Sequence, residues 1–200
     1  MELLTTARVL SQPSGYADKF MNYLSPVRNR TITDWTMEQL NIRPYQHILE
    51  IGYGAGYTLQ EVARKLKIGF LAGIDESIVR YRQAYRRNKK LIRDQLLQLH
   101  IGNIHELPYP HHYFHTIYGS NIRLPGKEPQ YALFQLGNLL KSGGRLVMVL
   151  QPEKITDENE LEQIAEKIKQ DFLQAEFRNV QIEFRDMYPV SGIAVTGFKE

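Results

Sequence analysis

Three glycines at alternate positions follow an apolar run that carries a carboxylate. The segment HILEIGYGAGYTLQEVARKL, residues 47–66, contains Glu50 and then Gly52, Gly54 and Gly56 before a helical pattern begins. Glycine lets the backbone come close to a ligand because it has no Cβ. The free N–H groups at the start of the following helix favour an anionic group. The segment therefore predicts a turn that binds a ligand with a negatively charged portion.

The spacing of the glycines argues against a dinucleotide. The dinucleotide fingerprint is G-x-G-x-x-G, whereas this turn reads G-x-G-x-G and has Tyr57 at the next position. Glu50 would repel a pyrophosphate, but it suits an ammonium group. Asp75, in GIDES, lies 19 residues beyond Gly56, the usual offset for an acid that binds ribose hydroxyls. A ligand with an amino acid at one end and a ribose at the other is S-adenosylmethionine.

Short apolar runs alternate with longer helical patterns around this segment. Runs of four to eight apolar residues are typical of buried strands, and apolar residues at three- and four-residue spacing are typical of helices. The alternation predicts a parallel sheet covered on both faces. The predicted strands are residues 47–51, 69–74, 96–101, 114–120 and 145–150, and the helices between them are 58–68, 77–95 and 129–142.

The two ends of the chain depart from this alternation. Two strands near the C-terminus are joined so closely that they must pair antiparallel, since a parallel pair needs a dozen or more linking residues. They are residues 179–187 and 191–199, after a predicted helix at 157–177. Residues 1–44 show no strand pattern and predict an N-terminal helical cap, with helices near 16–24 and 33–42. We expect the cap to be part of the same domain as residues 45–200.

The composition is that of an ordinary globular protein. Of the 200 residues, 42% are hydrophobic and 24% are charged, which favours one domain with a substantial core. The chain has no cysteine, so disulfides, thiolate metal sites and cysteine nucleophiles are excluded together. We see neither a signal-peptide pattern nor an apolar run near the roughly 20 residues that span a membrane. We therefore expect a cytoplasmic protein without a membrane partner.

Four blocks of the sequence, in this order, resemble the class I S-adenosylmethionine-dependent methyltransferases. They are ILEIGYGAG, GIDES, IGNIHELPYPHHYFHTIYGSN and LLKSGGRLVMVL, and the resemblance covers about residues 45–200. The stretch MNYLSPVRNRTITDWTMEQL is also similar to a bacterial subgroup of small methyltransferases with little-known substrates. The resemblance implies a Rossmann-like α/β fold with a seven-stranded, mostly parallel sheet, in the strand order 3-2-1-4-5-7-6 with strand 7 antiparallel. It also implies a methyltransferase that converts S-adenosylmethionine to S-adenosylhomocysteine.

The resemblance assigns a role to each matching position. The glycine turn and Glu50 would surround the methionine part of the cofactor, Asp75 would bind the ribose, and Asn103 would accept from the adenine amine. The cofactor-binding residues expected in this way are Glu50, Gly52, Tyr53, Gly54, Gly56, Asp75, Glu76, Ser77, Asn103, Ile104 and Ser120. Asn121, after the fourth strand, and Trp35, in the cap, are candidates for the lining of the acceptor pocket.

The chain departs from the family pattern in two places. Asn103 stands where the family usually has an aspartate, although its amide oxygen can still accept a hydrogen bond. The usual acidic pattern around the fourth strand is replaced by His112, Phe114 and His115. No catalytic base is assigned, because well-oriented reactants reach effective molarities of up to about 10⁵–10⁸ M without one. These departures motivate one alternative, a non-catalytic protein that binds S-adenosylmethionine.

Two further motifs suggest other functions. Residues 80–93 hold seven Lys or Arg and no acid, which is compatible with nucleic-acid binding and an RNA methyltransferase. A solvated face is favoured, because no aromatic platform interleaves with the charges. The motif HHYFH suggests a metal site, but the strand period places His111 and His115 on one face and His112 on the other. We therefore expect no metal and a small-molecule methyl acceptor.

Overall fold

The computed structural model describes residues 30–122, 124, 129–155 and 157–200. Residues 30–40 are helical, in agreement with the helix predicted near 33–42. The other predicted cap helix, near 16–24, lies outside the described residues.

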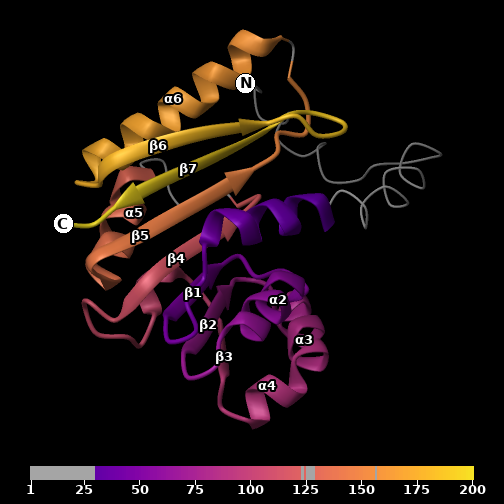
Figure 1. Cartoon of the computed structure of the whole chain (residues 1–200). Helices are drawn as coiled ribbons and strands as arrows, with labels where there is room; N and C mark the ends of the chain where they lie inside the picture. The colour runs from indigo at the N-terminus through magenta and orange to yellow at the C-terminus, as the bar shows by residue number, and fades with distance from the viewer. Residues whose placement is uncertain (1–29, 123, 125–128, 156) are drawn as a thin grey trace, which may run out of the picture.

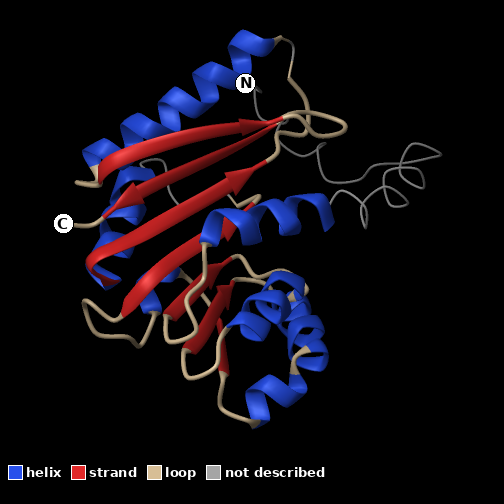
Figure 2. Cartoon of the chain, viewed as in Figure 1, coloured by secondary structure: helices blue, strands red, loops and turns tan. Residues whose placement is uncertain are grey.

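The described strands form a seven-stranded sheet in the order β3-β2-β1-β4-β5-β7-β6 (Figures 1 and 2). The pairs among β1 to β5 are parallel, and β7 is antiparallel to both β5 and β6. This confirms the predicted fold class and strand order. The strands are β1 (His47–Ile51), β2 (Phe70–Asp75), β3 (Leu97–Ile101), β4 (Phe114–Ser120), β5 (Leu140–Leu150), β6 (Arg178–Arg185) and β7 (Gly192–Phe198).

Helices cover both faces of the sheet (Figure 2). Neighbouring residues of a strand point to opposite faces, so each central strand contributes to two separate cores. Leu49 packs in one core with Leu133 and Phe172, and Ile48 packs in the other with Leu59. The first core belongs to α5 (Pro129–Leu139) and α6 (Glu158–Gln174), and the second to residues 30–40, α2 (Tyr57–Lys65) and α3 (Ile78–Arg87).

The helix predicted over residues 77–95 is interrupted in the structure. It is divided at Asn88 into α3 and α4 (Lys89–Arg93). The Asn88 backbone has φ −107° and ψ 20°, and its Nδ2 donates to Ala84 O and to Gly56 O, both at 3.0 Å. An asparagine side chain that bonds to backbone carbonyls competes with the helix ladder. The single helix was therefore a wrong prediction, and the break places Asn88 against the glycine turn.

A buried glutamine joins two loops at the carboxyl edge of β5. Gln151 is 3% exposed, and its backbone N donates to Asn121 Oδ1 at 2.7 Å. Its Nε2 donates to Tyr188 O at 3.1 Å and to Val190 O at 2.7 Å. The residue that follows β4 is therefore tied to the connection between β6 and β7.

Among the helices of the described residues, none combines the length and the apolar character needed to cross a membrane.

Candidate functional site

The glycine turn joins β1 to α2 at the carboxyl edge of the sheet. Gly52, Gly54 and Gly56 have φ values of +68°, +53° and +76°, which residues with a side chain rarely adopt. Gly56 N donates to Tyr53 O at 2.8 Å, and Gly52 N donates to Ile74 O of β2 at 2.8 Å. The path of the backbone therefore requires glycine at all three positions.

The end of α3 holds the outer side of this turn. Arg87 Nε donates to Ala55 O at 2.9 Å, and the next residue, Asn88, donates to Gly56 O. The Arg87 guanidinium also lies over the Tyr57 ring, 3.3 Å from its centroid. The last residue of α3 and the residue that follows it thus bind two consecutive carbonyls of the turn, so the shape of the turn depends on the end of a second helix.

Glu50 lies beneath the turn and is buried, with 2% of its surface exposed. It faces Tyr118 in the register of β1 and β4, and its Oε2 accepts from the Tyr118 hydroxyl at 2.7 Å. Burial raises the pKa of Glu50 to about 8, with a smaller raising effect from Asp75, and this outweighs the lowering effect of the Tyr118 hydrogen bond. Burial and the neighbouring Glu50 also raise the pKa of Tyr118, so the phenol keeps its proton and donates. Among the described residues no cation pairs with Glu50.

Asp75 ends β2 beside the glycine turn. Its Oδ2 accepts from Gly54 N and its Oδ1 from Ser77 N, both at 2.9 Å. Ser77 caps α3, because its hydroxyl accepts from Arg80 N at 3.3 Å, and Glu76 between them is exposed. A carboxylate offers about four lone-pair sites. Asp75 therefore keeps acceptor capacity for a ligand while it holds the turn and the start of α3.

Asn103 and Ile104 lie beyond the end of β3. Asn103 precedes the 3₁₀ turn η1 (Ile104–Glu106), and its Oδ1 accepts from His105 N at 3.2 Å. Ile104 is 7% exposed and packs in the core of α5 and α6. The Asn103 oxygen is thus already engaged locally, and Ile104 presents little surface to a ligand.

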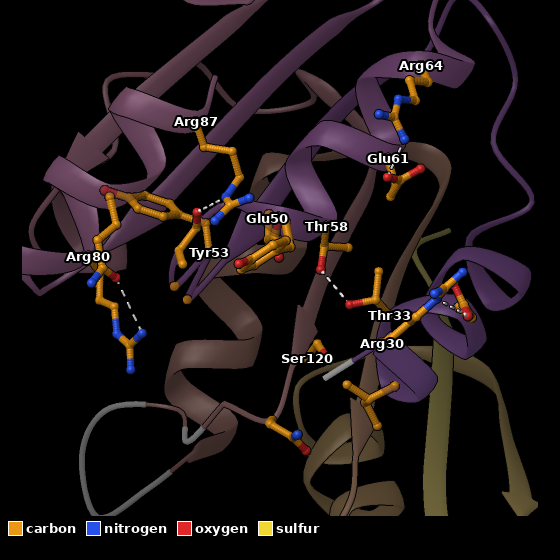
Figure 3. A pocket seen from close by; sticks show the side chains of 18 residues that line it. Arg30, Thr33, Glu50, Tyr53, Thr58, Glu61, Arg64, Arg80, Arg87 and Ser120 are labelled. Atoms are coloured by element: carbon orange, nitrogen blue, oxygen red, sulfur yellow. Dashed lines mark hydrogen bonds and ion pairs between the residues drawn. The ribbon is translucent and has the colours of Figure 1, made fainter. Parts of the chain in front are cut away.

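A cavity of about 1060 Å³ opens above the glycine turn (Figure 3). It brings together the residues expected around the methionine part of the cofactor and after strand four. The residues expected around the ribose and adenine stand apart from it, along the ends of β2 and β3. The predicted residues that line the cavity are Glu50, Gly52, Tyr53, Gly54, Ser120 and Asn121; those that do not are Gly56, Asp75, Glu76, Ser77, Asn103, Ile104 and Trp35.

Trp35 lies in the core rather than at the cavity. Its side chain is 1% exposed, and a Cβ added to Gly192 of β7 would lie 2.5 Å from its Cζ3 atom. The Arg185 guanidinium lies over the same ring, 5.2 Å from its centroid. The indole therefore packs the helical residues 30–40 against the sheet.

Arginines line the cavity at positions that sequence reasoning did not select. The basic run at 80–93 is predicted to be a solvated face; Arg80 and Arg87 are exposed as expected, but both also line the cavity. Their spacing with Gln83 places all three on one helical face, and this periodicity was the signal available in the sequence. The further lining residues are Arg30, Ile32, Thr33, Asp34, Ala55, Tyr57, Thr58, Glu61, Arg64, Arg80, Gln83 and Arg87.

The histidines of HHYFH lie away from this cavity. His115 is near the start of β4 and accepts, through Nδ1, from His47 N at 2.9 Å. Ser120, at the other end of β4, is five residues further on, which at about 3.3 Å per residue is roughly 16 Å away. Burial is the main cause that lowers the pKa of His115. Within the described part of the chain, no group of three or more His, Asp or Glu could hold a metal ion.

The cavity fits S-adenosylmethionine at its amino-acid end. Glu50 is a buried carboxylate with a hydroxyl partner and no cation, and an ammonium group would supply the missing counter-charge. The backbone at Gly54 is open, because a Cβ added there would meet nothing within 4 Å, whereas Ile122 packs against Gly52. The volume of about 1060 Å³ reaches the upper end of the roughly 300–1,000 Å³ typical of ligand pockets.

Comparison with known proteins points to the same chemistry. A family model described as "Methyltransferase domain" matches residues 48–144. An uncharacterized methyltransferase of Bacillus subtilis (strain 168), YdaC, is 27% identical over 178 residues, which are 88% of this chain and 96% of that protein.

Solved structures of low sequence identity share the fold. A SAM-dependent methyltransferase from Aquifex aeolicus superposes with a TM-score of 0.66 at 14% identity, over 84% of this chain and 89% of that one. Phosphoethanolamine N-methyltransferase 2 of Haemonchus contortus, in complex with phosphomonomethylethanolamine and S-adenosylhomocysteine, gives a TM-score of 0.67 at 12% identity. That match covers 84% of this chain and 52% of the nematode enzyme, so this chain spans about half of its length.

Proposed function

Because the chain belongs to the class I S-adenosylmethionine-dependent methyltransferase family, we propose that it transfers the methyl group of S-adenosylmethionine to a small-molecule acceptor. The protein is a methyltransferase, and what we propose is that its acceptor is a small molecule. Residues 45–200 form the methyltransferase domain in this proposal, and residues 1–44 its N-terminal cap.

The observation that carries the proposal is the cavity over the ends of β1 and β4. Glu50, Ser120 and Thr33, which belongs to the helical residues 30–40, all line it (Figure 3). Its volume of about 1060 Å³ exceeds what one drug-sized ligand usually needs. This volume leaves room for a small acceptor beside the amino-acid end of the cofactor, which is what a direct transfer requires.

Each end of the proposed cofactor site has a carboxylate suited to it. Glu50, once ionised, pairs with an ammonium at the amino-acid end, and Asp75 accepts from ribose hydroxyls with the lone pairs left free by Gly54 and Ser77. S-adenosylmethionine, when bound, supplies a methyl group on a positively charged sulfur. The protein's own task is to hold the acceptor in line with that group, and such positioning alone reaches effective molarities of up to about 10⁵–10⁸ M.

Asn121 is the proposed contact for the acceptor. It lines the cavity and is exposed, and its Oδ1 accepts from Gln151 N. That bond fixes the orientation of the amide and leaves the Nδ2 group as a donor. Ser120 beside it adds a hydroxyl. The wall near the proposed transfer site is therefore polar and able to orient a small nucleophile.

Calorimetry tests the cofactor part of the proposal. We expect S-adenosylhomocysteine and S-adenosylmethionine to bind the purified protein and NAD not to bind, because the glycine turn lacks the G-x-G-x-x-G spacing of a dinucleotide site. Heat for NAD with none for either adenosyl ligand would overturn the proposal.

A labelling experiment tests the acceptor part. The protein is incubated with methyl-labelled S-adenosylmethionine and a cell extract separated into nucleic acid, protein and small-molecule fractions. We expect the label in the small-molecule fraction, and a control sample of the Glu50→Gln variant should show little transfer. Label confined to nucleic acid would replace the small-molecule proposal with an RNA methyltransferase.

A further inference from the structure

One face of α3 presents two guanidiniums to the cavity. Arg80, Gln83 and Arg87 all line it, and their positions i, i+3 and i+7 fall on one side of a helix. Figure 3 shows Arg80 and Arg87 on the side of the cavity opposite Arg30 and Thr33. The methyl-transfer chemistry described above assigns no role to either of the two α3 arginines.

The charges of the cavity do not balance. Its other two arginines have carboxylate partners on their own helices: Arg64 pairs with Glu61, and Arg30 lies 4.0 Å from Asp34. Arg80 and Arg87 have no carboxylate partner within the described residues.

The remaining carboxylate of the lining does not correct this excess. Glu50 is buried against a phenol, and burial raises its pKa to about 8, so it is mostly uncharged near neutral pH. The cavity therefore carries an excess of positive charge on the α3 side. S-adenosylmethionine carries a sulfonium, an ammonium and a carboxylate, so its net charge is positive and it does not offset the excess as a whole.

Arg87 is held in an orientation suited to an anion. Its guanidinium plane stacks on Tyr57 at 3.3 Å, and its Nε donates to Ala55 O at 2.9 Å. A guanidinium has five N–H donors, so the four on the two Nη atoms are left for a ligand. A planar fork of this kind matches the oxygens of a carboxylate or a phosphate. Arg80 stands two helical turns away and has a long contact, 3.5 Å, to Gln83 Oε1.

The other arginines of α3 provide a contrast within the same helix. All four arginines of α3 are exposed, but Arg82 and Arg86 do not line the cavity. The cavity pair and the outer pair carry the same charge and differ in the face that they occupy.

We propose that Arg80 and Arg87 form a subsite of the cavity that binds a carboxylate or a phosphate group. This inference rests on the proposed function only for the source of the anion. The anionic group belongs either to the methyl acceptor or to the amino-acid end of the cofactor. The subsite itself follows from the two arginines, Tyr57 and the unbalanced charge of the cavity.

Two double variants of equal charge test the subsite. One is Arg80→Gln with Arg87→Gln, and the matched control is Arg82→Gln with Arg86→Gln. Calorimetry gives the affinity of each protein for orthophosphate and citrate in the presence of saturating S-adenosylhomocysteine. It also gives the affinity for S-adenosylhomocysteine itself and for 5′-methylthioadenosine, which lacks the amino-acid end.

The two sources of the anion give different results. If the acceptor carries it, the cavity variant loses at least tenfold in phosphate or citrate affinity and keeps its S-adenosylhomocysteine affinity. If the cofactor carries it, the cavity variant binds S-adenosylhomocysteine at least tenfold more weakly and 5′-methylthioadenosine unchanged. These losses correspond to charge-assisted hydrogen bonds, at about 1.4 kcal/mol per decade.

Two results would overturn the subsite: equal losses in the two double variants, or no loss in either. Thermal melting of both variants checks that they fold. If the cavity double variant does not fold, the single variant Arg80→Gln replaces it, because it leaves the Arg87 contacts to Tyr57 and Ala55 intact. Failure of the wild-type protein to bind S-adenosylhomocysteine would count against the proposed function. The orthophosphate and citrate titrations, repeated without S-adenosylhomocysteine, would still test the subsite.

Discussion

Glu50 offers a pH test of the cofactor site. The free protein buries this carboxyl against Tyr118, and burial raises its pKa to about 8. A ligand ammonium pairs only with the ionised form, so below pH 8 a proton must leave Glu50 when the ligand binds. The affinity for S-adenosylhomocysteine should therefore fall as the pH falls.

The size of the effect follows from the ionised fraction. Below about pH 7 that fraction drops tenfold per pH unit, which costs about 1.4 kcal/mol per unit. Above about pH 8 the ligand's own α-amino group starts to lose its proton, so the affinity should peak near pH 8. Calorimetry between pH 6 and 9 should show this profile for S-adenosylhomocysteine. It should show no acid-side decline for 5′-methylthioadenosine, which has no ammonium group.

Two variants separate this cause from a general effect of acid. Glu50→Gln removes the titrating group, so it should abolish the acid-side decline and weaken binding at pH 8 about ten- to hundredfold. Tyr118→Phe removes the hydrogen bond that lowers the pKa of Glu50, so the decline should start at a higher pH with the same slope. A wild-type affinity that is flat between pH 6 and 8 would refute the reasoning.

The same carboxyl makes the stability of the free protein depend on pH. The pKa of Glu50 is 4.5 in the unfolded reference and about 8 when folded, so its contribution is present below pH 4.5 and is lost as the pH rises toward 8. By pH 7 the loss is on the order of 3 kcal/mol, at about 1.4 kcal/mol per pH unit. Glu50→Gln should therefore melt higher than the wild type at pH 7–8 while it binds the cofactor more weakly.

Three further variants test other parts of the site. Asp75→Ala removes the carboxylate that holds Gly54 N and Ser77 N and should weaken S-adenosylhomocysteine about ten- to hundredfold; unchanged affinity in calorimetry would exclude Asp75 from cofactor binding. Asn88→Ala leaves two carbonyls without their side-chain donor and should lower the free energy of unfolding by about 1–3 kcal/mol. The melting temperature should fall by about 2–4 °C per kcal/mol, and an unchanged melting temperature would contradict this. Reversal of the exposed Arg86, Lys89 and Lys90 to Glu should leave S-adenosylhomocysteine affinity unchanged, whereas salt-sensitive RNA binding lost in that variant would point to a nucleic-acid acceptor.

Much of the fold was predictable because parallel strands are buried on both faces. Such strands are continuous apolar runs, and the first, HILEI, was assigned with the bounds that β1 has in the structure. The start of β5 was placed at residue 145 and lies at Leu140. The segment between contains Ser142, Gly143 and Gly144, residues that favour turns, and its extended path depends on the pairing of Phe114 with Leu140 across an irregular register.

The missed features all depend on contacts between distant residues. Asn88 breaks a helix because Gly56, 32 positions away, needs a donor for its carbonyl. Tyr118 meets Glu50 across 68 positions, and only the register of β1 and β4 fixes that pair. By contrast, the glycine turn is local, so its left-handed conformation could be inferred from the glycines alone. The position of Arg80 and Arg87 at the cavity had a periodic signal in the sequence, although both side chains are exposed, as their charge suggests.

The bond between Gln151 and Asn121 has a consequence for how acceptor choice can change. Gln151 also holds the carbonyls of Tyr188 and Val190, so a wall residue of the cavity takes its position from the hairpin connection far along the chain. The glycine turn, by contrast, is anchored on β2 and α3. If Asn121 contacts the acceptor as proposed, we expect mutations around residues 186–191 to alter selectivity for the acceptor while the cofactor site is preserved. A library built for a new methyl acceptor should begin at that connection.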